Sequence, residues 1–332
     1  MNDSWDFLLS EFRRLGGIAD NICQKKGKYG RGIFSVNPNL KARIFVPAKL
    51  FIKKEDIYLK DEKLRIKNDK EYDQEIKNFF NFYQDNFSWG FGGRETTEFF
   101  EKGLSLFNPN LKELIKKYAL VDIDLRHSEE WENVLKTQFL NARKVKFENN
   151  NVIAPVWELV NHKVRSLSFI TNNEGISTPN HLPPNGEIRH SYNDMSSLGR
   201  FFLYGFFSQE TMVFSIPFSL KIADQDIYIA CKGMSLKNDS MVIKRFDKKF
   251  ILEGLPIADI NHPRLPYDYF DEILRRININ HILSEDLLCR ILQFNILIRK
   301  KIIDQSDLIN NEVSKILGKV LQYEISLISS HD

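Results

Sequence analysis

Apolar positions change their spacing several times along the chain, and these changes predict a succession of helical and strand segments. Over residues 4–17, Trp5, Leu8 and Phe12 recur at helical spacing, and a Gly-Gly pair closes the segment. This pattern predicts a helix with a glycine stop. From 18 to about 66, short β-branched and aromatic runs are broken by Gly, Pro and Asn, which is typical of strands and turns.

The rest of the chain alternates between the same two patterns on a larger scale. From about 70 to 148, apolar side chains return to helical spacing, as in "EYDQEIKNFFNFYQDNF". Strand patterns reappear in 152–160 and 200–253, and 262–330 is helical again. The stretch "TNNEGISTPNHLPPNGE" (171–187) consists of turn-forming residues and predicts a surface loop.

The strands therefore come in two blocks, separated by a helical insert and followed by a helical tail, and this order predicts an α+β protein. The predicted parts are 1–66, 67–149, 150–255 and 256–332. The βαβ alternation of a dinucleotide-binding fold is missing, as are GxGxxG and GxxxxGK[ST] motifs. The common nucleotide-binding folds are thereby disfavoured.

Composition narrows the class of protein. The 332 residues are 42% hydrophobic with a net charge of +3, which favours a globular protein and gives no basis for a nucleic-acid partner. The three cysteines are far apart with no CxxC pair, so neither a disulfide framework nor a cysteine metal site is expected. Without ~20 consecutive apolar residues, no membrane span is expected. We expect a cytoplasmic protein, and delivery to a host cell stays open.

Three short stretches carry candidate chemistry, and each has an ordinary alternative explanation. The glycines of "GKYGRGIFS" (27–35) would allow a backbone to approach a ligand closely, although such turns are common. The Asn-His pair that ends "APVWELVNHK" (154–163) could be a structural hydrogen-bonded pair. In "NGEIRHSYNDMSSLGRFFLYGFF" (185–207), a turn precedes a strand that runs to Tyr192, whose ring could simply pack.

Taken together and in this order, the stretches resemble the SET-domain protein methyltransferases, specifically the Rubisco-methyltransferase-like branch. The matching segments are Gly30-Arg31-Gly32-Ile33-Phe34, Glu158-Leu159-Val160-Asn161-His162, Gly186-Glu187 through Ser191-Tyr192, and Tyr204-Gly205-Phe206. "NARKVKF" (141–147) stands where the family has S-R-x-F, with Arg143 matching the arginine. The resemblance covers essentially the whole chain.

The resemblance implies a SET-type β core with a knot-like active site, split by a helical insert and followed by an all-helical domain that docks a protein substrate. It implies S-adenosylmethionine as cofactor, protein-lysine N-methylation as activity, and no metal. Tyr192 would be catalytic, with its hydroxyl beside the transferring methyl group. The implied cofactor-binding residues are Tyr29, Gly30, Arg31, Gly32, Arg143, Glu158, Asn161, His162 and Tyr192.

The sequence also departs from the family pattern beside the implied cofactor pocket. Glu158 replaces an aspartate, Ala142 a serine, Asn193 a glycine and Leu198 an asparagine. Two alternatives therefore stay open: a protein-histidine N-methyltransferase on the same fold, and a catalytically inactive SET-like scaffold that binds a partner.

Overall fold

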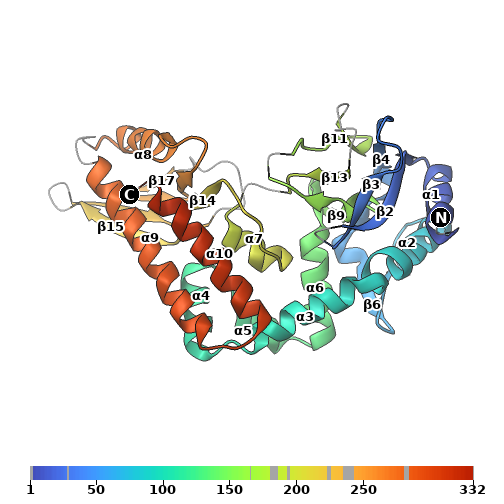
Figure 1. Ribbon diagram of the computed structural model, residues 1–332, viewed down its shortest axis with the longest axis horizontal. Coiled ribbons are helices and arrows are strands. Elements are labelled where there is room, and N and C mark those ends of the chain that lie inside the picture. The colour runs from blue at the N-terminus through green and yellow to red at the C-terminus, as the bar shows by residue number, and fades with distance from the viewer. Residues whose placement is uncertain are drawn as a thin grey trace. The chain divides into compact units, whose positions relative to one another are not determined.

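The computed structural model forms two compact units, each built from two stretches of chain (Figure 1). The first unit comprises Met1–Glu98 and Glu129–Tyr192, and the second comprises Phe99–Ser128 and Asn193–Asp332. The structure describes residues 3–27, 30–164, 166–179, 186–192, 195–222, 226–234, 243–279 and 284–331. Helices and strands are both abundant, so the predicted α+β class is confirmed.

Short strands and a few helices make up the first unit. Its helices and helical turns are α1 (Asp3–Arg14), η1 (Ala48–Leu50), η2 (Lys54–Asp56), α2 (Gln74–Phe87), η3 (Trp89–Gly93), α6 (Trp131–Arg143) and η4 (Trp157–Leu159). Its strands are β1 (Ile18–Asp20), β2 (Ile22–Gly27), β3 (Gly30–Ser35), β4 (Arg43–Pro47), β5 (Ile52–Lys53), β6 (Ile57–Lys60), β7 (Lys63–Ile66), β8 (Val145–Phe147), β9 (Asn150–Ile153), β10 (Asn161–His162), β11 (Ile170–Asn172), β12 (Gly175–Ser177) and β13 (Glu187–His190).

The strands of the first unit form small sheets around one apolar core. The sheet orders are β1-β4-β12-β11, β10-β13-β3-β2, β5-β9-β8 and the hairpin β6-β7. The predicted N-terminal helix is confirmed as α1, and its Leu8 and Phe12 are completely buried. On α2, Phe80 and Tyr83 are likewise completely buried, so both helices contribute one apolar face to this core.

In the second unit, helices surround two small sheets. Its helices are α3 (Arg94–Ser105, which begins in the first unit), α4 (Pro109–Tyr118), α5 (Ile123–Ser128), α7 (Ser197–Tyr204), α8 (Leu265–Arg276), α9 (Ser284–Asp307) and α10 (Glu312–Ser329). Its strands are β14 (Met212–Phe214), β15 (Phe218–Ile222), β16 (Ile227–Cys231), β17 (Ile243–Phe246), β18 (Lys249–Leu252) and β19 (Pro256–Asp259). They form the sheets β14-β19 and β15-β16-β18-β17.

The two longest helices of the second unit confirm the helical pattern predicted for 262–330. Helices α9 and α10 run side by side (Figure 1). Helix α9 begins at Ser284, and Asn311 caps α10 by accepting a hydrogen bond from the Ser314 backbone N–H at 2.7 Å. The predicted four-part division of the chain stays a prediction. None of the helices among the described residues is both long and apolar enough to cross a membrane.

The expected surface loop at 171–187 is wrong in its first part, because residues 170–177 form a hairpin. The Asn172 side chain accepts hydrogen bonds from the backbone N–H groups of Glu174 and Gly175, which closes the turn. Ile176 is then buried opposite Val46 of β4. Strands this short carry too little alternation to stand out from turn-forming neighbours. Residues 180–185 lie outside the described part.

Two other predicted boundaries were also wrong. The strand expected over 152–160 ends at Ile153, because Val156 has φ = 68° and leads into the helical turn η4. The helical pattern expected to reach 148 ends at Arg143, and Val145 then pairs with Val152 in β8-β9. In both places a backbone turn within an apolar run changes the element without changing the hydrophobic pattern.

Candidate functional site

One sheet of the first unit brings together the three stretches that the sequence singles out. Strand β10 runs parallel to β13, with Asn161 opposite Arg189 and His162 opposite His190. Strand β13 is also antiparallel to β3, with Ile188 opposite Ile33. The glycine hairpin, the Asn-His pair and the strand leading to Tyr192 therefore become neighbours (strands β2, β3 and β13 in Figure 1).

Asn161 is fixed by both donors of its side-chain amide. Its Nδ2 donates to the backbone oxygen of Arg31 at 3.0 Å and to Oε1 of Glu187 at 2.5 Å. Gly32 is required for this arrangement, because a Cβ there would lie 2.6 Å from Asn161 Nδ2 and 2.3 Å from Glu187 Oε1. The amide oxygen Oδ1 has no donor among the described residues, so it remains able to accept a hydrogen bond from a ligand.

Glu187 is a member of this cluster that was not among the predicted binding residues. Its side chain is 3% exposed and forms an ion pair with Arg189, whose Nη2 lies 2.6 Å from Oε2. The ion pair offsets the cost of burying a charged group. The Gly-Glu pair was noticed in the sequence, but nothing there indicated that the carboxylate contacts Asn161.

Tyr192 lies directly beside the Asn-His pair. Its backbone N–H donates to Nδ1 of His162 at 3.2 Å, and its hydroxyl donates to the backbone oxygen of Val160 at 2.8 Å. The first bond assigns the ring proton of a neutral His162 to Nε2. The bond to Val160 holds the phenol oxygen of Tyr192 at the residue that precedes Asn161. The family resemblance implies one cofactor site for Asn161, His162 and Tyr192, and the structure places these residues side by side.

A cluster of rings lies on the other side of Tyr192 and centres on His190. The His190 ring centroid is 4.7 Å from Trp157, 5.0 Å from Phe169 and 5.2 Å from Tyr192. Burial, with a smaller electrostatic contribution from nearby His162, lowers the pKa of His190 to about 3, so this ring is neutral. Neither its nitrogens nor Trp157 Nε1 have a hydrogen-bond partner among the described residues. None of the sequence motifs indicated this cluster of rings.

Glu158 and Arg143 contact one another rather than the Asn161 amide. Glu158 is fully buried, and its Oε1 accepts hydrogen bonds from Gln84 Nε2 at 3.1 Å and Ser88 Oγ at 2.7 Å. Arg143 Nε lies 3.7 Å from Oε2, and its guanidinium stacks on Phe139. Burial raises the pKa of Glu158, and Arg143 opposes that shift. A cofactor role for these two residues stays a prediction.

Arg31 points its side chain at a turn that the sequence pattern did not predict. Its guanidinium carbon lies 3.6 Å from the ring centroid of Phe91 in η3. A Cβ on Gly92 would lie 2.4 Å from Arg31 Nη2, so the glycine makes room for the cation. Burial lowers the pKa of Arg31, and its Nη1 is buried without a partner among the described residues. The glycine-rich run "WGFGG" (89–93) is the feature of the sequence that could have indicated this turn.

The tip of the glycine hairpin is only partly described. Tyr29, a predicted binding residue, lies outside the described residues. Gly30 has φ = 91° and would have nothing within 4 Å of an added Cβ, so its backbone faces open space. Among the described residues, no group of three or more His, Cys, Asp or Glu side chains is placed to hold a metal ion.

Comparison with known proteins gives distant likenesses only. No family model matches the chain, and no curated protein does. It is similar to the SET domain of LSMT bound to lysine and AdoHcy, with 11% identity and a TM-score of 0.48 over 100% of this chain and 90% of that one. It is also similar to Rubisco LSMT bound to sinefungin and monomethyllysine, with 12% identity and a TM-score of 0.48 over 99% of this chain and 90% of that one. A third similar structure is Rubisco LSMT bound to AdoMet, with 13% identity and a TM-score of 0.43 over 100% of this chain and 91% of that one. Such identities and TM-scores are too low to carry a function from those proteins to this chain.

Proposed function

We propose that this protein is an S-adenosylmethionine-dependent protein methyltransferase whose acceptor is a lysine amine. The observation that supports this most is the Asn161 cluster, in which Gly32 makes room for the Asn161 and Glu187 side chains and the Asn161 amide oxygen is left without a donor among the described residues. A ligand that carries a hydrogen-bond donor can use this free acceptor. Asn161 directly follows Val160, whose backbone carbonyl accepts the hydrogen bond of the Tyr192 hydroxyl.

The donors and acceptors present fit the amino-acid end of that cofactor. Asn161 Oδ1 can accept from an ammonium group, and the unpartnered Nη1 of Arg31 can donate to a carboxylate. The open backbone of Gly30 allows close approach of a ligand. When bound, S-adenosylmethionine supplies a methyl group on a positively charged sulfur, the electrophile of the reaction.

Tyr192 and the nearby backbone would serve the transfer by orientation and electrostatics. Methyl transfer needs a neutral amine whose lone pair points along the line of displacement. A phenol oxygen fixed by its bond to Val160, together with backbone carbonyls, can stabilise partial positive charge at the reacting carbon. The apolar rings around His190 would exclude water on one side, and an apolar environment lowers the pKa of an amine toward its neutral form.

The helical tail would dock the protein substrate, which is a proposal of its own. Exposed apolar side chains on the tail support it, among them Leu297 at 48% and Leu308 at 73% exposure. Such side chains are candidates for contact with a partner. A cytoplasmic location stays a prediction.

Two measurements test the function. Calorimetric titration with S-adenosylmethionine is expected to show binding to the purified protein, and absence of binding would favour the inactive scaffold. Incubation of a cell extract with methyl-labelled cofactor, followed by acid hydrolysis, is expected to yield labelled methyl-lysine. Label recovered as methyl-histidine would contradict lysine as the acceptor but would still support protein methyltransferase activity. An Asn161→Ala preparation serves as the matched control in both measurements.

A further inference from the structure

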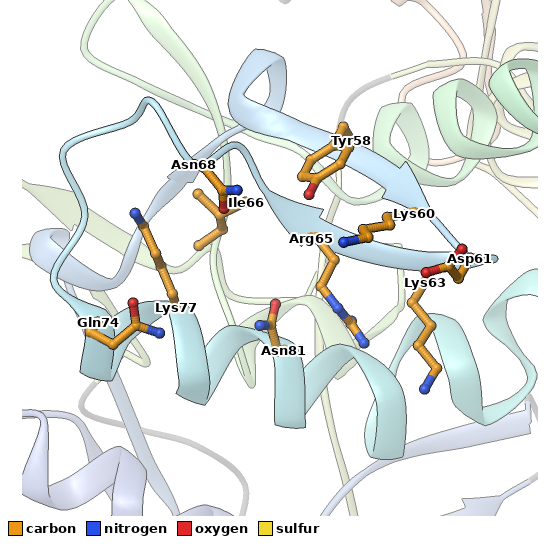
Figure 2. Close-up of a pocket in the computed structure, with 10 residues that line it drawn as sticks. All are labelled: Tyr58, Lys60, Asp61, Lys63, Arg65, Ile66, Asn68, Gln74, Lys77 and Asn81. Carbon is orange, nitrogen blue, oxygen red and sulfur yellow. The ribbon is translucent and has the colours of Figure 1, made fainter.

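A polar pocket lies in the first unit, apart from the residues of the candidate site. It has a volume of about 420 Å³ and lies between the β6-β7 hairpin and the N-terminal half of α2 (Figure 2). Its lining includes Tyr58, Lys60, Lys63, Arg65, Lys77 and Asn81. This volume is within the usual range for small-molecule sites.

Positive charge dominates the lining. Lys60, Lys63 and Lys77 have no ion-pair partner among the described residues, and Asp61 is the acidic residue among those that line the pocket. Arg65 is neutralised, because both of its terminal nitrogens donate to the Asp85 carboxylate at 2.8 Å. The three lysines outnumber the one lining carboxylate, Asp61, so the pocket lining keeps a net positive charge.

The positively charged side chains come from both walls of the pocket, and Lys63 extends from the hairpin tip toward the far end of α2 (Figure 2). In Figure 2, Lys77 and Asn81 rise from α2 toward the hairpin, while the amine of Lys60 extends from β6 into the space between them. Oδ1 of Asn81 is buried without a partner among the described residues. Rotation of this amide by 180° would present its NH2 group to an anion.

The walls are held in place before any ligand binds. The Arg65–Asp85 pair joins β7 to α2. At the hairpin tip, the backbone oxygen of Glu62 accepts a hydrogen bond from Trp89 Nε1 at 2.7 Å, and its carboxylate pairs with Arg94 at 2.6 Å. A preformed site loses less conformational entropy on binding.

We propose that this pocket binds an extended anion that carries two or more phosphate groups along its row of lysines. Lysine ammonium groups are effective phosphate ligands because they act as mobile point charges. The apolar lining is limited to Ile66 and the ring of Tyr58, which offers no pair of flat surfaces to hold a nucleobase. The charge therefore selects an oligophosphate, and the wall chemistry disfavours a nucleotide. This inference does not depend on the proposed methyl transfer.

The test is calorimetric titration of the full chain with inorganic tripolyphosphate, repeated with ATP. Wild type is expected to bind tripolyphosphate, with affinity that weakens as salt is raised from about 50 to 200 mM because the attraction is screened. ATP is expected to bind no better. The variant Lys63→Gln/Lys77→Gln is expected to lose about tenfold or more in affinity, because each change removes a charge-assisted contact.

A matched pair of exposed lysines in the same unit provides the control. Lys41→Gln/Lys146→Gln makes the same change in net charge away from the pocket lining and should bind tripolyphosphate within twofold of wild type. Equal loss in both variants would show a diffuse charge effect and overturn the site, as would absence of binding to wild type. ATP binding at least tenfold tighter than tripolyphosphate would overturn the oligophosphate assignment. Melting temperatures of both variants, measured alongside, confirm that each is folded.

Discussion

The Arg299 network of the second unit and the Asn161 cluster of the first unit both hold polar groups away from water, but only the Arg299 network is complete. Arg299 and Glu324 are both fully buried, with Nε 2.7 Å from Oε2. Arg299 also donates to Asn295 and to the Phe214 backbone, and the other Glu324 oxygen accepts from the Leu198 backbone N–H. The Asn161 cluster keeps an unused acceptor. We take completeness to indicate a structural role and an unused acceptor to indicate a ligand.

Leu198 is a residue near the Arg299 network whose role is structural. The family that the sequence resembles has an asparagine at this position. Here the Leu198 side chain is buried in an apolar core of the second unit, and its backbone N–H is bound by Glu324. In this structure the departure from the family pattern is explained by packing.

The largest expected effect is on stability and comes from breaking the complete network. Arg299→Met would leave the Glu324 carboxylate buried without its cation and should lower the free energy of unfolding by about 3–5 kcal/mol. Denaturant unfolding followed by circular dichroism measures it. The double variant Arg299→Met/Glu324→Met should recover most of the loss. A single-variant loss below about 1 kcal/mol would contradict the structural reading.

Next in size is the effect of Tyr192→Phe on the rate of methyl transfer. The ring remains, but the hydroxyl that binds Val160 is lost. Removal of one preorganised polar contact typically lowers turnover by about 10²–10³-fold. Methylation rate and cofactor affinity should be measured on one preparation, and affinity should be retained. A rate within threefold of wild type would exclude a catalytic role, and a parallel fall in affinity would indicate a structural residue.

A smaller effect is expected from Asn161→Ala on cofactor affinity. The change removes the unused acceptor and both donors of the cluster, and should weaken S-adenosylmethionine binding by about 1.5–3 kcal/mol. Calorimetry measures the affinity, and thermal melting verifies the fold. The control is Asn151→Ala, an exposed position on β9. Equal affinity of a folded Asn161→Ala protein and wild type would remove Asn161 from the cofactor site.

The smallest effect expected is a dependence of stability on pH that originates at His190. The pKa of His190 is about 3 in the folded protein, whereas its ordinary value, which applies to the unfolded chain, is 6.5. As the pH falls, the unfolded chain is therefore protonated before the folded protein. The contribution of His190 to stability is complete above pH 6.5 and is lost as the pH falls toward 3, by about 2 kcal/mol at pH 5. His190→Phe should flatten the change in melting temperature between pH 7 and 5. The exposed control His262→Gln should not. An unchanged slope in His190→Phe would exclude His190 as the source.

The sequence motifs identified individual residues of the candidate site, but few of the contacts among them. Asn161, His162 and Tyr192 were identified from their order, and their proximity was expected from the family resemblance. Contacts between stretches were missed, such as Glu187 with Asn161 or Phe91 beneath Arg31. These contacts depend on strand pairing and on glycines that leave room for a side chain from a distant part of the chain. Hydrophobic periodicity predicts helices and strands, but it does not predict which strands pair or which side chains approach a glycine.

Gly32 has a consequence for how this protein can change over evolutionary time. A methyl group at this position would collide with the Asn161 amide and the Glu187 carboxylate together, so the three residues constrain one another although they are far apart in the chain. A larger residue at position 32 is compatible only with smaller or redirected side chains at 161 and 187. Among relatives of this chain, these three positions should therefore co-vary as one unit.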